Sequence, residues 1–188
     1  GRPPLLISIN LSARQLAQSD LLASVEAILS ATGTDPASLC FEISERVFIN
    51  GADPYLGVLD ALKALGAHIA LDNFGIGNSS LSCLSVLPLD RLKIDRSLIA
   101  ALATDTDTDD RSAVGAVIGL ASALGLPVVA CGVESVDQLA QLRLHGCGLA
   151  QGFLLGEPRP AAAVRFSPAT DSSQFAPSSL VLPGERSI

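Results

Sequence analysis

The sequence lacks three features that would assign it to familiar classes of protein. No run of about 20 residues is free of charged and turn-forming residues, so we expect no membrane-spanning helix. No signal peptide is predicted, because the apolar run after Arg2 is too short. Paired-cysteine motifs of the CxxC type are absent, which leaves four cysteines that we expect to be buried, reduced thiols of a cytoplasmic protein: Cys40, Cys83, Cys131 and Cys147.

Charged residues are also scarce, at 16% of the chain, and the acidic ones outnumber the basic ones. Hydrophobic residues make up 48% and the net charge is −7, a composition typical of a globular domain. An acidic surface repels polyphosphates, so we predict no binding to a nucleic acid polymer or to an anionic membrane. A small anionic ligand remains compatible with this charge when metal ions lie between it and the protein.

Short apolar runs alternate along the chain with longer stretches of helical periodicity. The runs predict strands at residues 5–9, 39–43, 68–71, 91–95, 127–130 and 149–154. The periodic stretches predict helices at residues 20–32, 54–65, 81–87, 109–124 and 135–145. Alternating βα units imply a parallel sheet, either open and doubly wound or closed as a barrel. No GxGxxG fingerprint follows the first strand, which disfavours a dinucleotide-binding fold.

The composition changes near the C-terminal end of the chain. Residues 1–160 are predicted to form one α/β domain, because the βα pattern runs through them. Residues 161–188 are rich in proline, serine and alanine, and after a short helix near 161–166 we expect a disordered tail. The chain begins with Gly1 and enters a strand almost at once, so we expect it to be a piece of a longer protein.

Polar residues occur where the predicted strands end. They are Asn10, Glu42, Asp72, Lys93, Asp95, Cys131, Glu134 and Gln151. In a parallel barrel these positions surround the C-terminal mouth, where active sites are built. Amide and carboxylate oxygens are hard ligands, which suit Mg²⁺ or Mn²⁺ better than zinc. The pattern therefore predicts a divalent-metal site suited to a phosphodiester.

Each of these residues also has a purely structural interpretation. Asn10 could cap the turn that follows its strand. Glu42 and Lys93 lie within apolar runs, and a buried charge needs a partner. An ion pair of Lys93 with Glu42 or Asp72, without catalysis, would satisfy that need. The glycine-rich residues 73–79 are either a turn-rich loop or a mobile lid.

Taken in order, six segments resemble the EAL family, the phosphodiesterases that linearise cyclic di-GMP. They are INLSARQL at 9–16, FEISE at 41–45, LDNFGIGNSSL at 71–81, LKIDRS at 92–97, CGVE at 131–134 and GLAQGF at 148–153. The resemblance covers residues 5–158. It implies a TIM-like (β/α) barrel, incomplete here, with about six βα units and the first strands missing. It also implies two divalent cations, Mg²⁺ or Mn²⁺, that hold the phosphodiester and activate a water.

By the same resemblance, site roles fall on particular residues. The metal ligands of the family match Asn10, Glu42 and Asp72, with Asn73 as a weakened ligand. Catalytic positions match Lys93 near the attacking water, Cys131 at the general-base position, Gln151 beside the site and Glu45 as the anchor of the loop after Asp72. Substrate-binding positions match Asn10, Asp95 and Gln151.

The chain departs from the family pattern at three places. The first strand, which carries the Glu-Ala-Leu motif, is absent. The paired aspartates of the family are here Asp72 and Asn73, so one negative charge is lost. The first glutamate of the Glu-Gly-Val-Glu motif is here Cys131, whose thiol is shorter and uncharged near neutral pH unless its pKa is depressed. These departures predict a silent or very weak phosphodiesterase.

Three functions are compatible with this sequence. The first is a degenerate EAL domain that binds cyclic di-GMP as a regulatory module. The second is a working phosphodiesterase whose first strand lies upstream in a longer bacterial protein. The third is a scaffold that binds neither ligand nor metal. The resemblance also allows a GGDEF or sensor domain upstream, and a homodimer, as partners.

Overall fold

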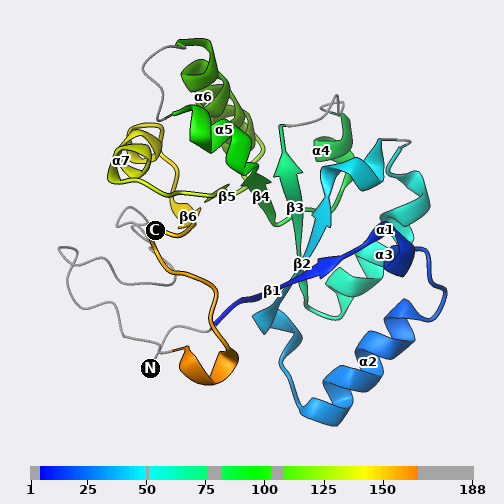
Figure 1. The fold of residues 1–188 in the computed structure, drawn as a ribbon. Coiled ribbons are helices and arrows are strands. Elements are labelled where there is room, and N and C mark those ends of the chain that lie inside the picture. Colours follow the sequence, from blue (N-terminus) through cyan, green and yellow to red (C-terminus); the bar gives the residue numbers. More distant parts are fainter. Residues whose placement is uncertain (1–4, 50, 76–81, 103–107, 165–188) are drawn as a thin grey trace, which may run out of the picture. The chain divides into compact units, whose positions relative to one another are not determined.

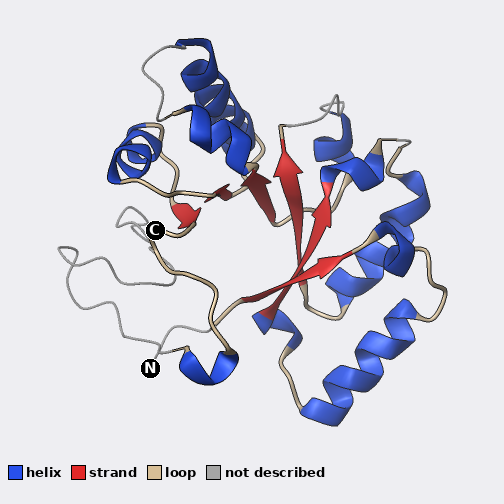
Figure 2. Cartoon of the chain, in the orientation of Figure 1, coloured by secondary structure: helices blue, strands red, loops and turns tan. Residues whose placement is uncertain are grey.

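The structure, a computed structural model, describes residues 5–49, 51–75, 82–102 and 108–164 (Figures 1 and 2). The chain divides into two compact units, residues 1–92 and 93–188, and each is described by itself. In the part of the chain that is described, no helix is both long and apolar enough to cross a bilayer.

The first unit is built on three parallel strands in the order β1, β2, β3. Its elements are β1 (Ile7–Leu11), α1 (Ala13–Leu16), α2 (Leu21–Thr32), η1 (Pro36–Ser38), β2 (Leu39–Ser44), η2 (Glu45–Phe48), α3 (Asp53–Ala64), β3 (His68–Phe74) and α4 (Ser82–Val86). The strand β4 (Arg91–Ile94) lies at the division between the two units. Each strand is followed by helical segments, as the alternating pattern predicts.

The central strand β2 is buried along almost its whole length, from Leu39 to Ile43. A parallel strand covered on both faces reads as a continuous apolar run, which explains why the sequence signal is strong here. The helix α3 packs through Leu59 and Leu62, which are completely buried one turn apart. The helix α2 ends at Gly33, whose φ of 65° is the left-handed conformation expected of a residue that terminates a helix.

The strand β1 is exposed along most of its length, in contrast to β2. Ile7 is 54% exposed and Ile9 is 40% exposed, although both are paired with buried residues of β2. Their apolar side chains lie on the same face as Leu39 and Phe41, because paired residues of a parallel ladder point to the same side. This face of β1 is therefore apolar and uncovered in the described structure.

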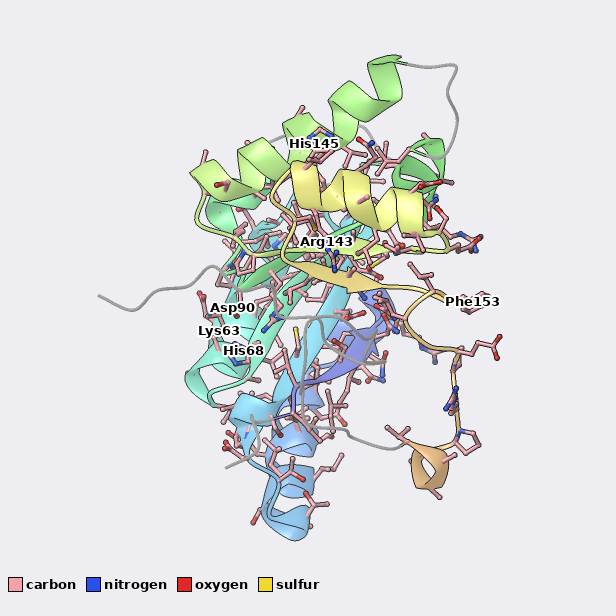
Figure 3. All side chains as sticks on the ribbon, turned by 90° about the vertical axis from the view of Figure 1, so that its left-hand side faces the viewer. Lys63, His68, Asp90, Arg143, His145 and Phe153 are labelled. Carbon is pink, nitrogen blue, oxygen red and sulfur yellow. The ribbon has the colours of Figure 1, made fainter. Side chains whose placement is uncertain are left out.

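Asp90 connects two elements of the first unit at the N-terminal end of β3 (Figure 3). Its Oδ1 atom lies 2.6 Å from Nζ of Lys63 on α3, and its Oδ2 accepts a hydrogen bond of 2.8 Å from the amide of Ile69. The Asp90 amide donates to the Ile69 carbonyl at 2.8 Å, and Nδ1 of His68 lies 3.8 Å from Oδ2. These contacts join α3, β3 and the approach to β4, at the opposite end of β3 from Asp72.

The second unit contains α5 (Arg96–Ala101), α6 (Thr108–Ala123), β5 (Val128–Cys131), α7 (Val136–Leu144), β6 (Leu149–Gln151) and η3 (Ala161–Ala163). The strands β5 and β6 pair in parallel. Helix α6 buries Val114, Ile118 and Ala121, which recur at helical spacing, and α7 buries Leu139 and Leu142.

The structure corrects three predictions about elements and burial. The first strand is Ile7–Leu11 rather than 5–9, so Asn10 lies inside it. The last strand ends at Gln151 rather than 154, because the chain turns there and the amide of Leu155 donates to the carbonyl of Gly152 at 3.0 Å. Cys40 and Cys147 are buried thiols outside any disulfide, as predicted, but Cys131 is only half-buried. The predicted lid residues 76–79 and tail residues 165–188 lie outside the described residues.

Candidate functional site

In the first unit, strand register places three of the predicted metal ligands on one face of the sheet. Asn10 is the partner of Glu42, and Ser44 is the partner of Asp72. Because side chains two residues apart on a strand share a face, Asn10, Glu42 and Asp72 point to the same side. Asn10 is exposed, Asp72 is half-buried and Glu42 is 7% exposed. This face presents two carboxylates and an amide.

Asn73 occupies an unusual backbone conformation beside Asp72. Its φ is 58°, and among the described residues no other non-glycine residue has a positive φ. Asparagine tolerates this left-handed region better than most residues. Its Nδ2 atom donates a hydrogen bond of 3.1 Å to Oδ2 of Asp72. One oxygen of the Asp72 carboxylate is thus already engaged by its neighbour.

Glu45 connects the end of β2 with the turn that follows β3. It begins the η2 turn directly after β2, and it is only 3% exposed. Its Oε2 atom accepts a hydrogen bond of 3.3 Å from the amide of Gly75, a residue with φ of 101°. A side chain at Gly75 would strain this conformation. The contact lies next to Asp72 and Asn73.

In the second unit, β5 and β6 bring two other predicted site residues together. Cys131 and Gln151 are direct partners in the parallel ladder, so their side chains share a face. Cys131 is half-buried and Gln151 is exposed. The Sγ atom of Cys131 lies 3.9 Å from the carbonyl oxygen of Val129, a long and weak contact.

Lys93 and Asp95 are both buried, at 7% exposure each, on β4 and at the start of α5. The Oδ1 atom of Asp95 accepts a hydrogen bond of 2.8 Å from the amide of Ser97, which makes Asp95 the N-cap of α5. Capping satisfies one of the free amides at a helix start. Part of the reason for an aspartate here is therefore local helix stability.

A buried glutamine that the sequence analysis missed organises the segment after Cys131. Gln138 is 5% exposed, and its Oε1 atom accepts hydrogen bonds from the amides of Glu134 at 2.8 Å and Ser135 at 3.0 Å. Its Nε2 atom donates to the carbonyl of Ile99 at 3.1 Å. The available signal was the spacing of Ser135 and Gln138, which is that of a capping box.

The cysteine thiols of the second unit differ in environment. Burial raises the pKa of the Cys147 thiol, and hydrogen bonds with backbone groups of Leu149 and Ala130 oppose this rise only in part. Its Sγ atom lies 3.3 Å from the carbonyl oxygen of Leu149. Cys147 is thus an unreactive thiol of the core, whereas Cys131 is partly accessible.

Among the described residues, no group of three or more His, Cys, Asp or Glu side chains could hold a metal ion. This result agrees with the composition of the first unit's face, where one amide, that of Asn10, accompanies the carboxylates of Glu42 and Asp72. The predicted ligands Asn10, Glu42 and Asp72 share a face there, and Cys131 and Gln151 are paired in the second unit.

Successive βα units, parallel strand pairs and polar residues toward the strand ends define an α/β domain built on a parallel sheet. The family model of the EAL domain matches residues 1–158, and the chain belongs to the EAL domain family.

Comparison with a solved EAL protein confirms the predicted fold. The chain is 43% identical to the structure described as the PaMucR phosphodiesterase in complex with c-di-GMP, with a TM-score of 0.79. The match covers 84% of this chain and 63% of that one, in agreement with an incomplete (β/α) barrel of the EAL type. A calcium and cyclic di-GMP complex of BlrP1 from Klebsiella pneumoniae is 31% identical, with a TM-score of 0.75 over 81% of this chain and 39% of that chain.

Among curated proteins, the chain is 43% identical over 155 residues to the bifunctional diguanylate cyclase/cyclic di-GMP phosphodiesterase MucR of Pseudomonas aeruginosa. The match covers 82% of this chain and 22% of MucR. The chain spans about a quarter or less of the curated relatives that it matches first, at 22–25% of their lengths.

Proposed function

We propose that this EAL domain binds cyclic di-GMP with the help of a divalent cation and hydrolyses it slowly or not at all, so that it acts as a binding or regulatory module. The observation that carries the proposal is the register of β1, β2 and β3, which aligns Asn10, Glu42 and Asp72 on one face. The similarity to a phosphodiesterase solved with c-di-GMP supports the choice of ligand.

The donor set fits a hard divalent cation such as Mg²⁺ or Mn²⁺. Carboxylate and amide oxygens from Glu42, Asp72 and Asn10 would hold it, because such ions prefer oxygen ligands. When bound, such a cation polarises a phosphoryl oxygen and lowers the pKa of a coordinated water. It would also offset the repulsion between an anionic dinucleotide and a chain with a net charge of −7.

Two features of the chain support weak catalysis. Asn73 is neutral and donates a hydrogen bond to Asp72. The pair therefore attracts cations with one negative charge, whereas the paired aspartates of the family carry two. Cys131 occupies the position that matches the general base of the family, and a neutral thiol accepts a proton poorly. Loss of a general base costs about 10²–10⁴-fold in rate. Lys93, Asp95 and Gln151 are retained in the sequence, which supports the proposal that the domain still binds the ligand.

Calorimetric titration of the 188-residue chain with cyclic di-GMP tests binding. We expect heat of binding in Mn²⁺, no heat after EDTA treatment, and linear dinucleotide formed far more slowly than by an active EAL enzyme. An absence of heat up to high micromolar ligand in Mn²⁺ would contradict the proposal. Tight binding of a protein partner that EDTA leaves unchanged would then favour a scaffold.

Restoring the family residues tests the assigned roles. The double variant Asn73→Asp, Cys131→Glu should regain turnover, and each single variant should regain less. Ala140→Glu is a matched control, because it also adds a carboxylate but on the exposed surface of α7. If the double variant binds cyclic di-GMP but hydrolyses it no faster than the parent chain or the control, the roles carried over to residues 73 and 131 are wrong.

A second candidate function is a working phosphodiesterase that a preceding segment completes. The uncovered apolar face of β1, with Ile7 and Ile9 exposed, favours it, because a further βα unit would cover that face. A protein extended upstream should then convert cyclic di-GMP to the linear dinucleotide while the 188-residue chain does not. Since the similar protein MucR is named as bifunctional, a diguanylate cyclase (GGDEF) domain in the same chain is a proposed partner.

A further inference from the structure

Gln138 is a buried polar side chain in the second unit whose hydrogen bonds reach two separate elements. It is the third residue of α7, and its amide donates to Oγ of the N-cap Ser135 at 3.2 Å. Its Oε1 atom accepts from two consecutive amides, those of Glu134 and Ser135. Its Nε2 atom donates to the Ile99 carbonyl of α5, 39 residues earlier in the chain. The helices α5 and α7 are joined through this side chain.

The two elements that Gln138 joins both carry candidate site residues. The amides of Glu134 and Ser135 end the segment that begins at Cys131. The helix α5 begins at Arg96, three residues after Lys93, and is capped by Asp95. Gln138 therefore connects the end of the Cys131–Ser135 segment to the helix that follows β4.

The beginning and middle of that segment are held by close backbone contacts. Gly132 has a φ of 79°, and a Cβ atom there would collide with Arg96 of α5. The amide of Val133 donates to the carbonyl of Gln151 at 3.0 Å, and the amide of Leu154 donates to the carbonyl of Val133 at 3.1 Å. Gln138 supplies the corresponding attachment at the end of the segment.

We propose that Gln138 is a positioning residue, which holds the Cys131–Ser135 segment against α5. It thereby fixes the position of Cys131, one of the candidate site residues. Its effect on the binding of a phosphodiester rests on the proposed function. Glutamine fits the position because one side chain must both accept from two amides and donate to a carbonyl. An apolar residue would leave these buried groups without their partner, and ionised glutamate would point an acceptor at the Ile99 carbonyl.

The variants Gln138→Glu and Gln138→Met separate the positioning role from helix capping. Ionised glutamate keeps an acceptor for the amides at the start of α7 but loses the donor to Ile99, whereas the protonated acid regains that donor. The labelling rate of Cys131 by a thiol reagent, assigned by peptide mass mapping, is measured relative to the parent chain between pH 5.5 and 8.5. For Gln138→Glu we expect the ratio of the labelling rates of variant and parent to be near 1 at low pH and to change roughly 5- to 100-fold at high pH. For Gln138→Met we expect this ratio to differ from 1 at every pH.

Leu142→Ala is the matched control, because Leu142 is 1% exposed on the same helix and contributes packing without these hydrogen bonds. We expect it to lower the melting temperature without a pH-dependent change in the labelling ratio. If Gln138→Glu labels like the parent chain across the pH range, or if Leu142→Ala reproduces its profile, the positioning role is overturned. The labelling measurement needs no ligand, so it tests the positioning role even if the chain does not bind cyclic di-GMP. Where the parent chain binds cyclic di-GMP, Gln138→Met should weaken that affinity more than Leu142→Ala does.

Discussion

Asn10 and Glu42 are direct partners across the parallel strands β1 and β2, one exposed and the other almost completely buried. The pairing combines a neutral amide and a carboxylate on one face, at the β1 edge of the sheet. Carboxylate and amide oxygens on neighbouring strands are the type of ligand that Mg²⁺ and Mn²⁺ prefer. The relationship leads to a prediction about cation binding.

Glu42→Gln should weaken Mn²⁺ binding by at least about tenfold, because the substitution removes a charged oxygen ligand while keeping the shape of the side chain. Titration with Mn²⁺, followed by its electron paramagnetic resonance signal, measures the change. Glu26→Gln removes the same charge from the exposed surface of α2 and should leave the affinity unchanged. Equal affinities of the two variants would remove Glu42 from the set of ligands.

Gly152→Ala should destabilise the chain by about 1–3 kcal/mol or more, because a Cβ atom would overlap the backbone of Val133, which cannot move aside easily. Gly119→Ala is the control, since Gly119 lies on the exposed surface of α6 with open space around it. That substitution should stabilise the chain by up to about 1 kcal/mol through helix propensity. Urea denaturation followed by circular dichroism measures both effects, and a Gly152→Ala variant as stable as the parent would refute the close approach.

Asp90→Ala should lower the free energy of unfolding by about 1–3 kcal/mol, because the buried amide of Ile69 loses its acceptor. The ion pair with Lys63 adds little to this loss, since the two side chains are 32% and 26% exposed and water screens them. Asp60→Ala, at an exposed position of α3, should change stability by no more than about 0.5 kcal/mol. Similar losses in both variants, measured by urea denaturation, would show that the Asp90 contacts contribute nothing specific.

The Cys147 thiol should make stability fall at alkaline pH. Burial raises its pKa above the ordinary value of 9.0, so the unfolded chain loses this proton at a lower pH than the folded chain. Its contribution is therefore complete below pH 9 and is lost as pH rises through the folded pKa, with a limiting slope of about 1.4 kcal/mol per pH unit. Cys147→Ala should be less stable overall but should show a shallower decline between pH 8.5 and 10.5 in urea denaturation. An unchanged slope would contradict the prediction.

Much of the fold could be predicted because its signals are local. The apolar run at β2 and the helical period of α2, followed by Gly33, depend only on neighbouring residues. The short helix α5 was missed, although Asp95 is its N-cap, because a helix of 6 residues spans too few turns to show a period. The predicted strand 149–154 is too long, because the chain turns after Gln151 and the amide of Leu154 then donates to the carbonyl of Val133, 21 residues away.

What the sequence by itself determined was the alternation of βα units, the identity of the polar residues at the strand ends, and the substitutions at Asn73 and Cys131. Those features depend only on the identity of single residues and on short spacings along the chain. Only the tertiary structure decided which of these residues are paired, because register joins strands that are distant in the chain. The same reason explains Gln138: its position three residues after Ser135 indicates a cap, but its bond to Ile99 exists only once α5 and α7 have packed together.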